Sequence, residues 1–307
     1  MKINSVLIAG AGAIGLSTAE SIYKYNPECI SILAKGERLE RYQKNGLWVN
    51  GERIKFRLVS EEKVDLIIVA CKYHHLDQII EDMTPSVGKD TIILSLLNGI
   101  TSEEIIGRKL GRQRLPLAMV LGTDPKHEGE KTTYTRKGFI HFGDADGKNG
   151  AREESIAEFF TRAGVPFKLE QDMKRSLWFK YMLNVGFNQT TAVLRLPYGV
   201  FQTKGNSGEI PESRLFVEKA MREVISVAKA EGIDLNDGDI EKCFNTVNLL
   251  SPAGYTSMLQ DVLAGRKTEV EMFSLALMEL AKKYGISVPV NEALYLQIRI
   301  IEKMQAK

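Results

Sequence analysis

The feature that most constrains the fold is a glycine-rich turn close to the N-terminus. Residues 3–9 predict a strand, residues 14–25 predict a helix, and the turn between them reads Gly10-Ala11-Gly12-Ala13-Ile14-Gly15. In dinucleotide-binding folds the first glycine of this motif permits the tight turn, the second lets the backbone approach a pyrophosphate, and the third lets helix and strand pack closely. The start of the helix offers N–H groups and positive potential to the phosphates. The alternative is a glycine-rich turn of the same fold that binds nothing.

Apolar runs and helical stretches alternate through the first half of the chain. Runs typical of buried strands occur at residues 29–34, 66–71, 91–95 and 117–122. Parallel strands that helices cover on both faces have such uninterrupted apolar runs. Residues 131–143 alternate between polar and apolar side chains, which predicts antiparallel edge strands, while residues 153–163 predict a helix and 166–169 a short closing strand.

The second half has a different pattern. Its expected helices cover residues 173–191, 211–231, 237–250, 257–284 and 291–305. Turn signals separate these helices, and only residues 194–196 leave a strand open. The sequence therefore predicts an α/β fold, with a Rossmann-type doubly wound sheet in residues 1–170 followed by an all-helical domain in residues 171–307.

Composition and charge exclude several other classes. The chain has 307 residues, and its 41 Lys and Arg against 39 Asp and Glu leave a net charge of +2, so we expect neither nucleic acid nor a membrane as partner. Three scattered cysteines are typical of a reducing compartment, and the four histidines show no metal-ligand spacing. No apolar run reaches the ~18 residues of a membrane span. We therefore expect a cytoplasmic protein without a bound metal.

The end of the second expected strand indicates which nicotinamide cofactor the chain prefers. An NAD-binding domain usually carries Asp or Glu about 20 residues after the glycine motif, where it holds the ribose 2′-hydroxyl. This chain has Lys35, Glu37 and Arg38 at that place, and Lys72 ends another strand at the same edge of the sheet. Lys35, Arg38 and Lys72 can bind a 2′-phosphate by charge-assisted hydrogen bonds, so NADPH is favoured over NADH. Solvated surface lysines are the alternative, and Glu37 weakens the distinction.

Polar residues at further places are candidates for a substrate site. Asn98-Gly99 follows the strand at residues 91–95, at the sheet edge where doubly wound folds bind ligands, although Asn-Gly is also a common turn. Lys180, Asn184 and Asn188 are spaced four residues apart, so they form one stripe on a helix whose other residues are mostly apolar. Because buried polar groups need partners, the stripe indicates the wall of a polar pocket rather than a solvent-facing surface.

Ser257 and Glu269 are ambiguous by themselves. Ser257 and Gln260 have the spacing of a capping box, so a helix cap explains Ser257 as well as a site does. Glu269 fits an exposed carboxylate on a charged helix equally well. Without further information, both structural interpretations are preferred.

Taken in order, however, these motifs resemble one family, the ketopantoate reductases (2-dehydropantoate 2-reductases). The resemblance covers nearly the whole chain and rests on Gly10 to Gly15, Lys72, Asn98-Gly99, Lys180, Asn184, Asn188, Ser257-Met258 and Thr268-Glu269. It implies a Rossmann-type domain, a helical domain and an active-site cleft between them. It also implies NADPH-dependent reduction of a small 2-keto acid, 2-dehydropantoate, to pantoate on the way to pantothenate and coenzyme A. A homodimer is left open.

The resemblance also implies a role for each residue. Lys180 matches the catalytic lysine, Glu269 the carboxylate that binds the substrate hydroxyl, and Asn98 the asparagine between cofactor and substrate. Substrate-holding positions match Asn184, Asn188 and Ser257. Hydride arriving at a ketone carbon builds negative charge on the oxygen, which an ammonium group can stabilise and protonate. Burial lowers the pKa of such a lysine and a neighbouring carboxylate raises it, so the sequence leaves the net direction open.

Two features depart from the family's usual pattern. Leu97 stands where a glutamine is usual, and the loop at residues 124–131 is unusually charged. They bear on the identity of the keto acid more than on the reaction. The alternative enzyme is a related NAD(P)H-dependent 2-keto-acid or opine-type dehydrogenase, and the alternative outside catalysis is a catalytically silent NADPH-binding regulator. A silent site predicts loss of Lys180 or Glu269, and both are present.

Overall fold

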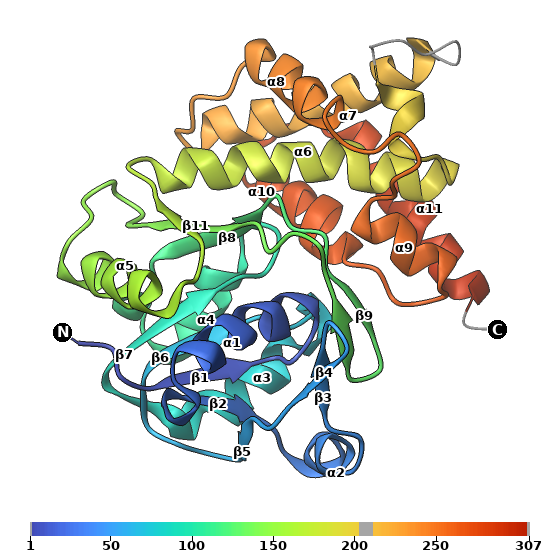
Figure 1. The fold of residues 1–307 in the computed structure, drawn as a ribbon. Coiled ribbons are helices and arrows are strands. Elements are labelled where there is room, and N and C mark those ends of the chain that lie inside the picture. Colours follow the sequence, from blue (N-terminus) through green and yellow to red (C-terminus); the bar gives the residue numbers. More distant parts are fainter. Residues whose placement is uncertain (1, 203–210, 306–307) are drawn as a thin grey trace. The chain divides into compact units, whose positions relative to one another are not determined.

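The computed structural model describes residues 2–202 and 211–305. The chain forms two compact units, Met1–Lys174 and Arg175–Lys307. The first unit is built on parallel strands with flanking helices and the second is helical, as Figure 1 shows. The predicted fold class, a Rossmann-type doubly wound sheet followed by a helical part, is confirmed.

The central sheet of the first unit is parallel and has the order β5-β2-β1-β6-β7. Its strands are β1 (Val6–Ala9), β2 (Ile30–Leu33), β5 (Arg57–Val59), β6 (Val64–Val69) and β7 (Val87–Ser95). The register of β1 with its two neighbours is given by Ile8, which lies opposite Ile32 on β2 and Ile68 on β6. The chain runs from β1 outward to one edge and then returns to the other side of β1. The switch point therefore lies between β1 and β6, and ligands of doubly wound sheets bind beyond the carboxyl ends of such strands.

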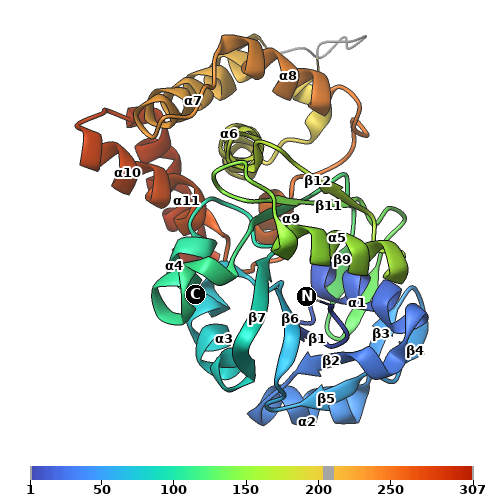
Figure 2. The ribbon, with the colours of Figure 1, turned by 90° about the vertical axis from the view of Figure 1, so that its left-hand side faces the viewer.

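Helices cover both faces of this sheet. The helices α1 (Ala13–Tyr25) and α5 (Ala151–Ala163) pack together on one face, and α3 (Leu76–Met83) and α4 (Ser102–Leu110) pack together on the other (Figure 2). A further helix, α2 (Gly36–Asn45), follows β2. Short 3₁₀ turns lie at Pro27–Cys29, Tyr73–His75, Thr84–Ser86 and Arg112–Arg114. The apolar runs at residues 29–34, 66–71 and 91–95 thus provide the buried strands β2, β6 and β7 of this sheet. The run at residues 117–122 does not belong to it: it forms a strand of a separate sheet and pairs antiparallel with residues 139–143, so the expected parallel strand there is wrong.

Two smaller sheets complete the first unit. One has the order β12-β11-β8 and comprises β8 (Leu117–Leu121), β11 (Phe139–Gly143) and β12 (Phe167–Leu169). The other has the order β4-β3-β10-β9 and comprises β3 (Leu47–Val49), β4 (Glu52–Ile54), β9 (Lys126–Glu128) and β10 (Lys131–Thr133). The expectation of edge strands at residues 131–143 is wrong for both strands found there, because β10 lies between β3 and β9 and β11 lies between β8 and β12. No pattern in the sequence marks β3, β4 and β5, because three-residue strands are too short to show a period.

The second unit begins within a long helix, α6 (Met173–Leu194), which excludes a strand at residue 194. A 3₁₀ turn (Tyr198–Phe201) follows, and then α7 (Pro211–Ala230), α8 (Asp237–Val247), α9 (Ser257–Leu263), α10 (Ala276–Tyr284) and α11 (Pro289–Gln305). The single helix expected at residues 257–284 is wrong. Gly265 adopts φ +65° just after α9, and a π-helical turn (Glu271–Leu275) precedes α10. No helix in the described ranges is long and apolar enough to cross a membrane.

Candidate functional site

The glycine turn after β1 has the geometry that a pyrophosphate requires. Gly10 adopts φ +118°, and a Cβ atom there would lie 2.7 Å from the carbonyl carbon of Ala70. A Cβ on Gly15 would lie 1.9 Å from the carbonyl oxygen of Gly10, so only glycine fits at both places. At Gly12 the nearest atom to such a Cβ is 3.9 Å away, which leaves the backbone open to a ligand. Two glycines therefore serve packing, and the third leaves room for a phosphate group.

The N-terminus of α1 is suited to an anion. The helix starts at Ala13, its first turn holds no acidic residue, and its first internal hydrogen bond runs from the Leu16 N–H to the carbonyl of Gly12 (2.9 Å). The N–H groups of Ala13, Ile14 and Gly15 therefore have no acceptor within the helix. Together with the helix dipole, such N–H groups could hold phosphate oxygens. The residues present thus fit a dinucleotide.

The three predicted cations at the adenosine end differ in their surroundings. Lys35 precedes α2, and its Nζ donates to the carbonyl of Asp82 near the end of α3 (2.9 Å). That contact engages its ammonium group with a helix C-terminus. Arg38 is half-buried on the first turn of α2, and Lys72 is half-buried directly before the 3₁₀ turn that follows β6. Which of Lys35, Arg38 and Lys72 contacts a 2′-phosphate stays a prediction.

Asn98 follows β7 in a loop that a buried network holds in place. Gly99 adopts φ +84°, which accounts for the Asn-Gly pair as a turn. Ser102 Oγ donates to Glu103 Oε2 (2.8 Å) and lies 2.8 Å from Ser95 Oγ at the end of β7. Glu103 Oε1 accepts from the N–H of Ala118, and burial raises the pKa of the Glu103 carboxyl. The sequence analysis missed this glutamate, because an acidic residue in the first turn of a helix usually indicates only a favourable dipole interaction.

The amide stripe of the second unit lies on one face of α6 and is internally hydrogen-bonded. Asn188 Nδ2 donates to Asn184 Oδ1 (3.0 Å), and Asn188 Oδ1 accepts from Ser257 Oγ (3.1 Å) and from the N–H of Met258 (3.3 Å). Both asparagines are buried, whereas Ser257 is exposed. The Asn188 side chain thus links Asn184 to the start of α9. In the described ranges, Asn184 Nδ2 has no protein acceptor, so it is available to donate to a ligand oxygen.

The cap of α9 differs from the one considered in the sequence analysis. Thr256, not Ser257, is the N-cap, and its hydroxyl accepts from the N–H of Leu259 (3.2 Å). The same hydroxyl lies 2.6 Å from Thr191 Oγ1 on α6. The capping-box interpretation of Ser257 is therefore wrong by one residue. Because Thr256 satisfies the helix end, the Ser257 hydroxyl is directed to Asn188 instead.

Lys180 and Glu269 interact electrostatically within the second unit. Lys180 is half-buried on α6, and Glu269 is 5% exposed in the segment before the π-helical turn. Burial lowers the pKa of the Lys180 amine from 10.5 to about 8, although the charge of Glu269 acts to raise it. Burial thus outweighs the carboxylate, which answers the question left open by the sequence. The neighbouring Tyr181 hydroxyl donates to the carbonyl of Phe273 (2.6 Å), which ties α6 to the π-helical turn.

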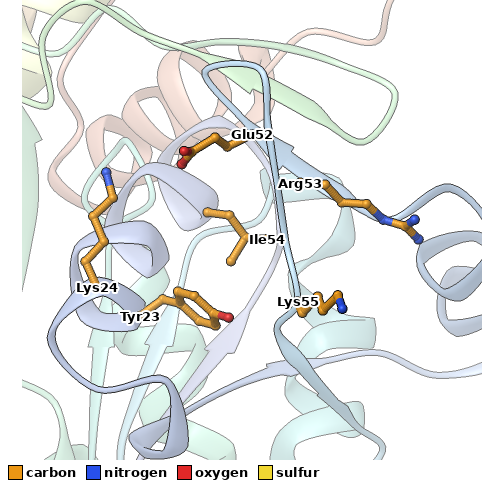
Figure 3. A pocket seen from close by; sticks show the side chains of 6 residues that line it. All are labelled: Tyr23, Lys24, Glu52, Arg53, Ile54 and Lys55. Carbon is orange, nitrogen blue, oxygen red and sulfur yellow. The ribbon is translucent and has the colours of Figure 1, made fainter.

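An open groove elsewhere on the first unit contains none of the predicted site residues. It lies at the end of α1 and along β4, and its lining residues are Tyr23, Lys24, Glu52, Arg53, Ile54 and Lys55 (Figure 3). Arg53 and Lys55 point away from Lys24, so these cations do not converge on one point (Figure 3). No cluster of three or more potential metal ligands occurs in the described part of the chain. Neither observation indicates a second site.

Comparison with known proteins gives a family for both halves of the chain. Residues 6–147 match the model of the ketopantoate reductases PanE/ApbA, and residues 172–302 match the model of the C-terminal region of the same family. The 2-dehydropantoate 2-reductase of Streptococcus pyogenes serotype M6 is 25% identical over 293 residues, which cover 92% of this chain and 93% of that protein.

Solved structures with the same fold cover almost the whole chain. A D-mandelate dehydrogenase solved with NADH and anilino(oxo)acetate superposes with a TM-score of 0.86 at 23% identity, covering 99% of this chain and 100% of that one. A dimeric ketopantoate reductase from Staphylococcus aureus superposes with a TM-score of 0.83 at 20% identity, covering 98% and 99% of the two chains. At these identities the likeness concerns the fold.

Proposed function

The chain belongs to the ketopantoate reductase family, and we propose that it reduces 2-dehydropantoate to pantoate with NADPH, a step towards pantothenate and coenzyme A. The observation that carries this proposal is Lys180, a half-buried amine with a pKa of about 8 that interacts with the buried carboxylate of Glu269. General acids work best when their pKa lies near the working pH. An amine with this pKa is largely protonated at neutral pH and can still release its proton.

A nicotinamide cofactor held by the turn from Gly10 to Gly15 would supply the hydride for the substrate's ketone carbon. Lys180 then donates a hydrogen bond and a proton from Nζ to the ketone oxygen, where negative charge develops. Within the second unit, Asn184 Nδ2 donates to a substrate oxygen, and Asn188 fixes its orientation through the contact to Asn184 Oδ1. The Glu269 carboxylate accepts a hydrogen bond from the substrate hydroxyl. Asn98, on the loop after β7, contacts the nicotinamide or the substrate.

Residues 1–170 would hold the cofactor, and residues 171–307 would supply the catalytic and substrate-holding groups. We assign the pyrophosphate to the turn from Gly10 to Gly15 and the 2′-phosphate to Arg38 and Lys72, with Lys35 in support. The 2′-phosphate of NADPH can form charge-assisted hydrogen bonds with these cations. NADH has no 2′-phosphate and cannot form them. The D-mandelate dehydrogenase of the same fold was solved with NADH, so NADH is the cofactor to compare against.

Oligomeric state and location extend the proposal. A homodimer is proposed because a relative of the same fold is a dimeric ketopantoate reductase. Sedimentation at several concentrations would test it, and a single monomeric species at micromolar concentration would contradict it. A cytoplasmic location is supported by the cysteines Cys29, Cys71 and Cys243, which form no disulfide in the described part of the chain, since reduced thiols persist in reducing compartments.

The decisive experiment measures NADPH oxidation against a panel of 2-keto acids. The panel contains 2-dehydropantoate, its analogue without the hydroxyl, phenylglyoxylate as the keto acid of mandelate, and pyruvate. We expect the highest kcat/KM for 2-dehydropantoate. A clear preference for phenylglyoxylate or for an amino-acid-dependent reductive condensation would replace the substrate assignment. Tight NADPH binding without turnover of any keto acid would indicate the silent regulator.

A further inference from the structure

The segment that carries Glu269 has little regular structure of its own. It joins the end of α9 to the π-helical turn, and the Met272 N–H donates to the carbonyl of Glu269 (3.1 Å) where that turn begins. A short connection of this kind does not by itself fix a side chain as closely as a helix does. The position of Glu269 therefore depends on what holds the residues on either side of it.

Thr268 is the residue that anchors this segment. It is fully buried, and both its N–H (2.8 Å) and its hydroxyl (2.6 Å) donate to one oxygen, Oε1 of Glu302 on α11. The Thr268 hydroxyl oxygen also accepts from the N–H of Val270 (3.3 Å). The backbone is thus fixed immediately before and immediately after Glu269. Hydrogen bonds to an ionised acceptor are roughly twice as strong as those between neutral groups.

Glu302 is itself held on its other oxygen. Arg299 Nη1 donates to Glu302 Oε2 (2.7 Å) and to Glu271 Oε1 (3.1 Å), and Lys267 Nζ lies 3.3 Å from the same Glu271 oxygen. The Glu302 side chain is 10% exposed, so solvent screens its contacts only weakly. Side chains from the last turns of α11 therefore bind the segment at Thr268 and, two residues beyond Glu269, at Glu271.

We propose that Glu302 is a positioning residue, which acts through Thr268 to fix the place of the Glu269 carboxylate relative to Lys180. This inference rests on the function proposed above, because it assigns a task to a residue remote from the reacting atoms. Displacing a catalytic group by about 1 Å can cost on the order of 100-fold in rate. Glu302, which reaches Glu269 only through Thr268, can therefore affect the rate without contacting the substrate.

Lys180 reports the position of Glu269 independently of catalysis. Glu269 is the charged group in the described ranges that raises the pKa of Lys180. Glu302, Glu271, Arg299 and Lys267 flank the segment, so a variant that changes the charge of Glu302 perturbs the field as well as the geometry. Neutral and charge-preserving variants must therefore be compared.

Four variants separate geometry from charge. Glu302→Ala removes both the charge and the acceptor, whereas Glu302→Gln removes the charge but keeps an oxygen that can accept from Thr268. Thr268→Val removes the hydroxyl without any change of charge. Lys303→Ala, an exposed neighbour on α11, is the matched control.

The first measurement is the pKa of Lys180, followed by NMR of lysine labelled at the ε-carbon. We expect a lower pKa in Glu302→Ala and in Thr268→Val, because a released Glu269 stabilises the ammonium less. Glu302→Gln should show a smaller fall, from the lost charge alone, and Lys303→Ala a value near wild type. An unchanged pKa in Thr268→Val, or a fall in Glu302→Gln as large as in Glu302→Ala, would overturn the proposal. If Glu302→Ala does not fold, Thr268→Val and Glu302→Gln still decide.

The second measurement is steady-state reduction of a hydroxylated 2-keto acid and of its analogue without the hydroxyl. We expect Glu302→Ala and Thr268→Val to lower kcat/KM for the hydroxylated substrate by at least about tenfold, and clearly less for the analogue. Equal losses for both substrates would assign Glu302 a purely structural role. If the wild type reduces no keto acid, the proposed function fails, and the Lys180 titration still tests the positioning.

Discussion

Replacing Lys180 by methionine tests the link between this amine's burial and its proposed role. Methionine keeps an unbranched apolar side chain and removes the charge. The pKa of Lys180 is lowered from 10.5 to about 8, which corresponds to roughly 3 kcal/mol of unfavourable free energy for the ammonium form at about 1.4 kcal/mol per pH unit. The folded protein carries this cost as long as the amine is protonated.

The sign of the pH dependence follows from the lowered pKa. Between about pH 8 and pH 10.5 the unfolded chain binds more protons at Lys180 than the folded chain does, so this residue makes the wild type more stable as the pH rises across that window. Below about pH 8 the full cost is present. We therefore expect Lys180→Met to raise the free energy of unfolding by about 1–3 kcal/mol near pH 7. The advantage over the wild type should shrink progressively above pH 8.

Activity should move in the opposite direction. Loss of a positioned acid typically costs about 10²–10⁴-fold in rate, so Lys180→Met should collapse kcat while the dissociation constant of NADPH stays nearly unchanged. In the wild type, reduction should slow as the pH rises through about 8, and oxidation of the alcohol should favour the higher pH.

Urea unfolding of both proteins at several pH values, with steady-state kinetics and fluorescence titration of NADPH, tests all three expectations. A stability difference that does not vary between pH 7 and 10.5 would refute the burial argument. Near-normal turnover by a folded Lys180→Met protein would refute the catalytic role.

Three further predictions concern the cofactor and the substrate. NADPH should bind more tightly than NADH. Arg38→Glu should reduce the difference between the two dissociation constants more than Lys35→Glu does, because the Lys35 amine already donates to a backbone carbonyl. Equal dissociation constants of the two cofactors in the wild type would contradict this prediction. Glu269→Ala should mainly raise KM for a hydroxylated keto acid, and an identical loss with the analogue lacking the hydroxyl would indicate a structural role. Gly15→Ala should destabilise the fold by several kcal/mol, since its Cβ would overlap a backbone oxygen. Gly12→Ala should leave the melting temperature unchanged and weaken the binding of NADPH. Calorimetry and NADPH titration of both variants distinguish the two glycines.

The elements that could be predicted are those whose burial requires a recognisable pattern of apolar residues. Strands such as β1 and β6 are buried on both faces, so their residues are continuously apolar and the run is visible without any partner. The three-residue strands β3 and β4 pair with each other and expose part of their side chains, so no pattern marks them. The break after α9 had a signal, Gly265, whose positive φ ends the helix, but glycine inside a helical pattern is often tolerated.

The same distinction applies to the site. Gly10 could be assigned because its positive φ is a local requirement of the turn, and Gly15 because its Cβ would meet the carbonyl oxygen of Gly10. The stripe on α6 could be assigned because helical spacing brings its members together. The family is confirmed by models that match residues 6–147 and residues 172–302. The roles of the individual residues stay predictions.

Glu103 and Glu302 could not be found in the sequence for a physical reason. Each is one carboxylate among 39 acidic residues. What distinguishes each from the others is that some of the groups that donate to it come from distant segments. Glu103 accepts from Ala118 on β8, and Glu302 accepts from Thr268, 34 residues earlier. A sequence does not distinguish a surface glutamate from a buried one. Only the buried carboxylate must have its hydrogen bonds satisfied within the protein, and it can therefore determine the geometry of its donors. Residues of this kind, which hold a site without entering it, are where a structure adds most to a family assignment.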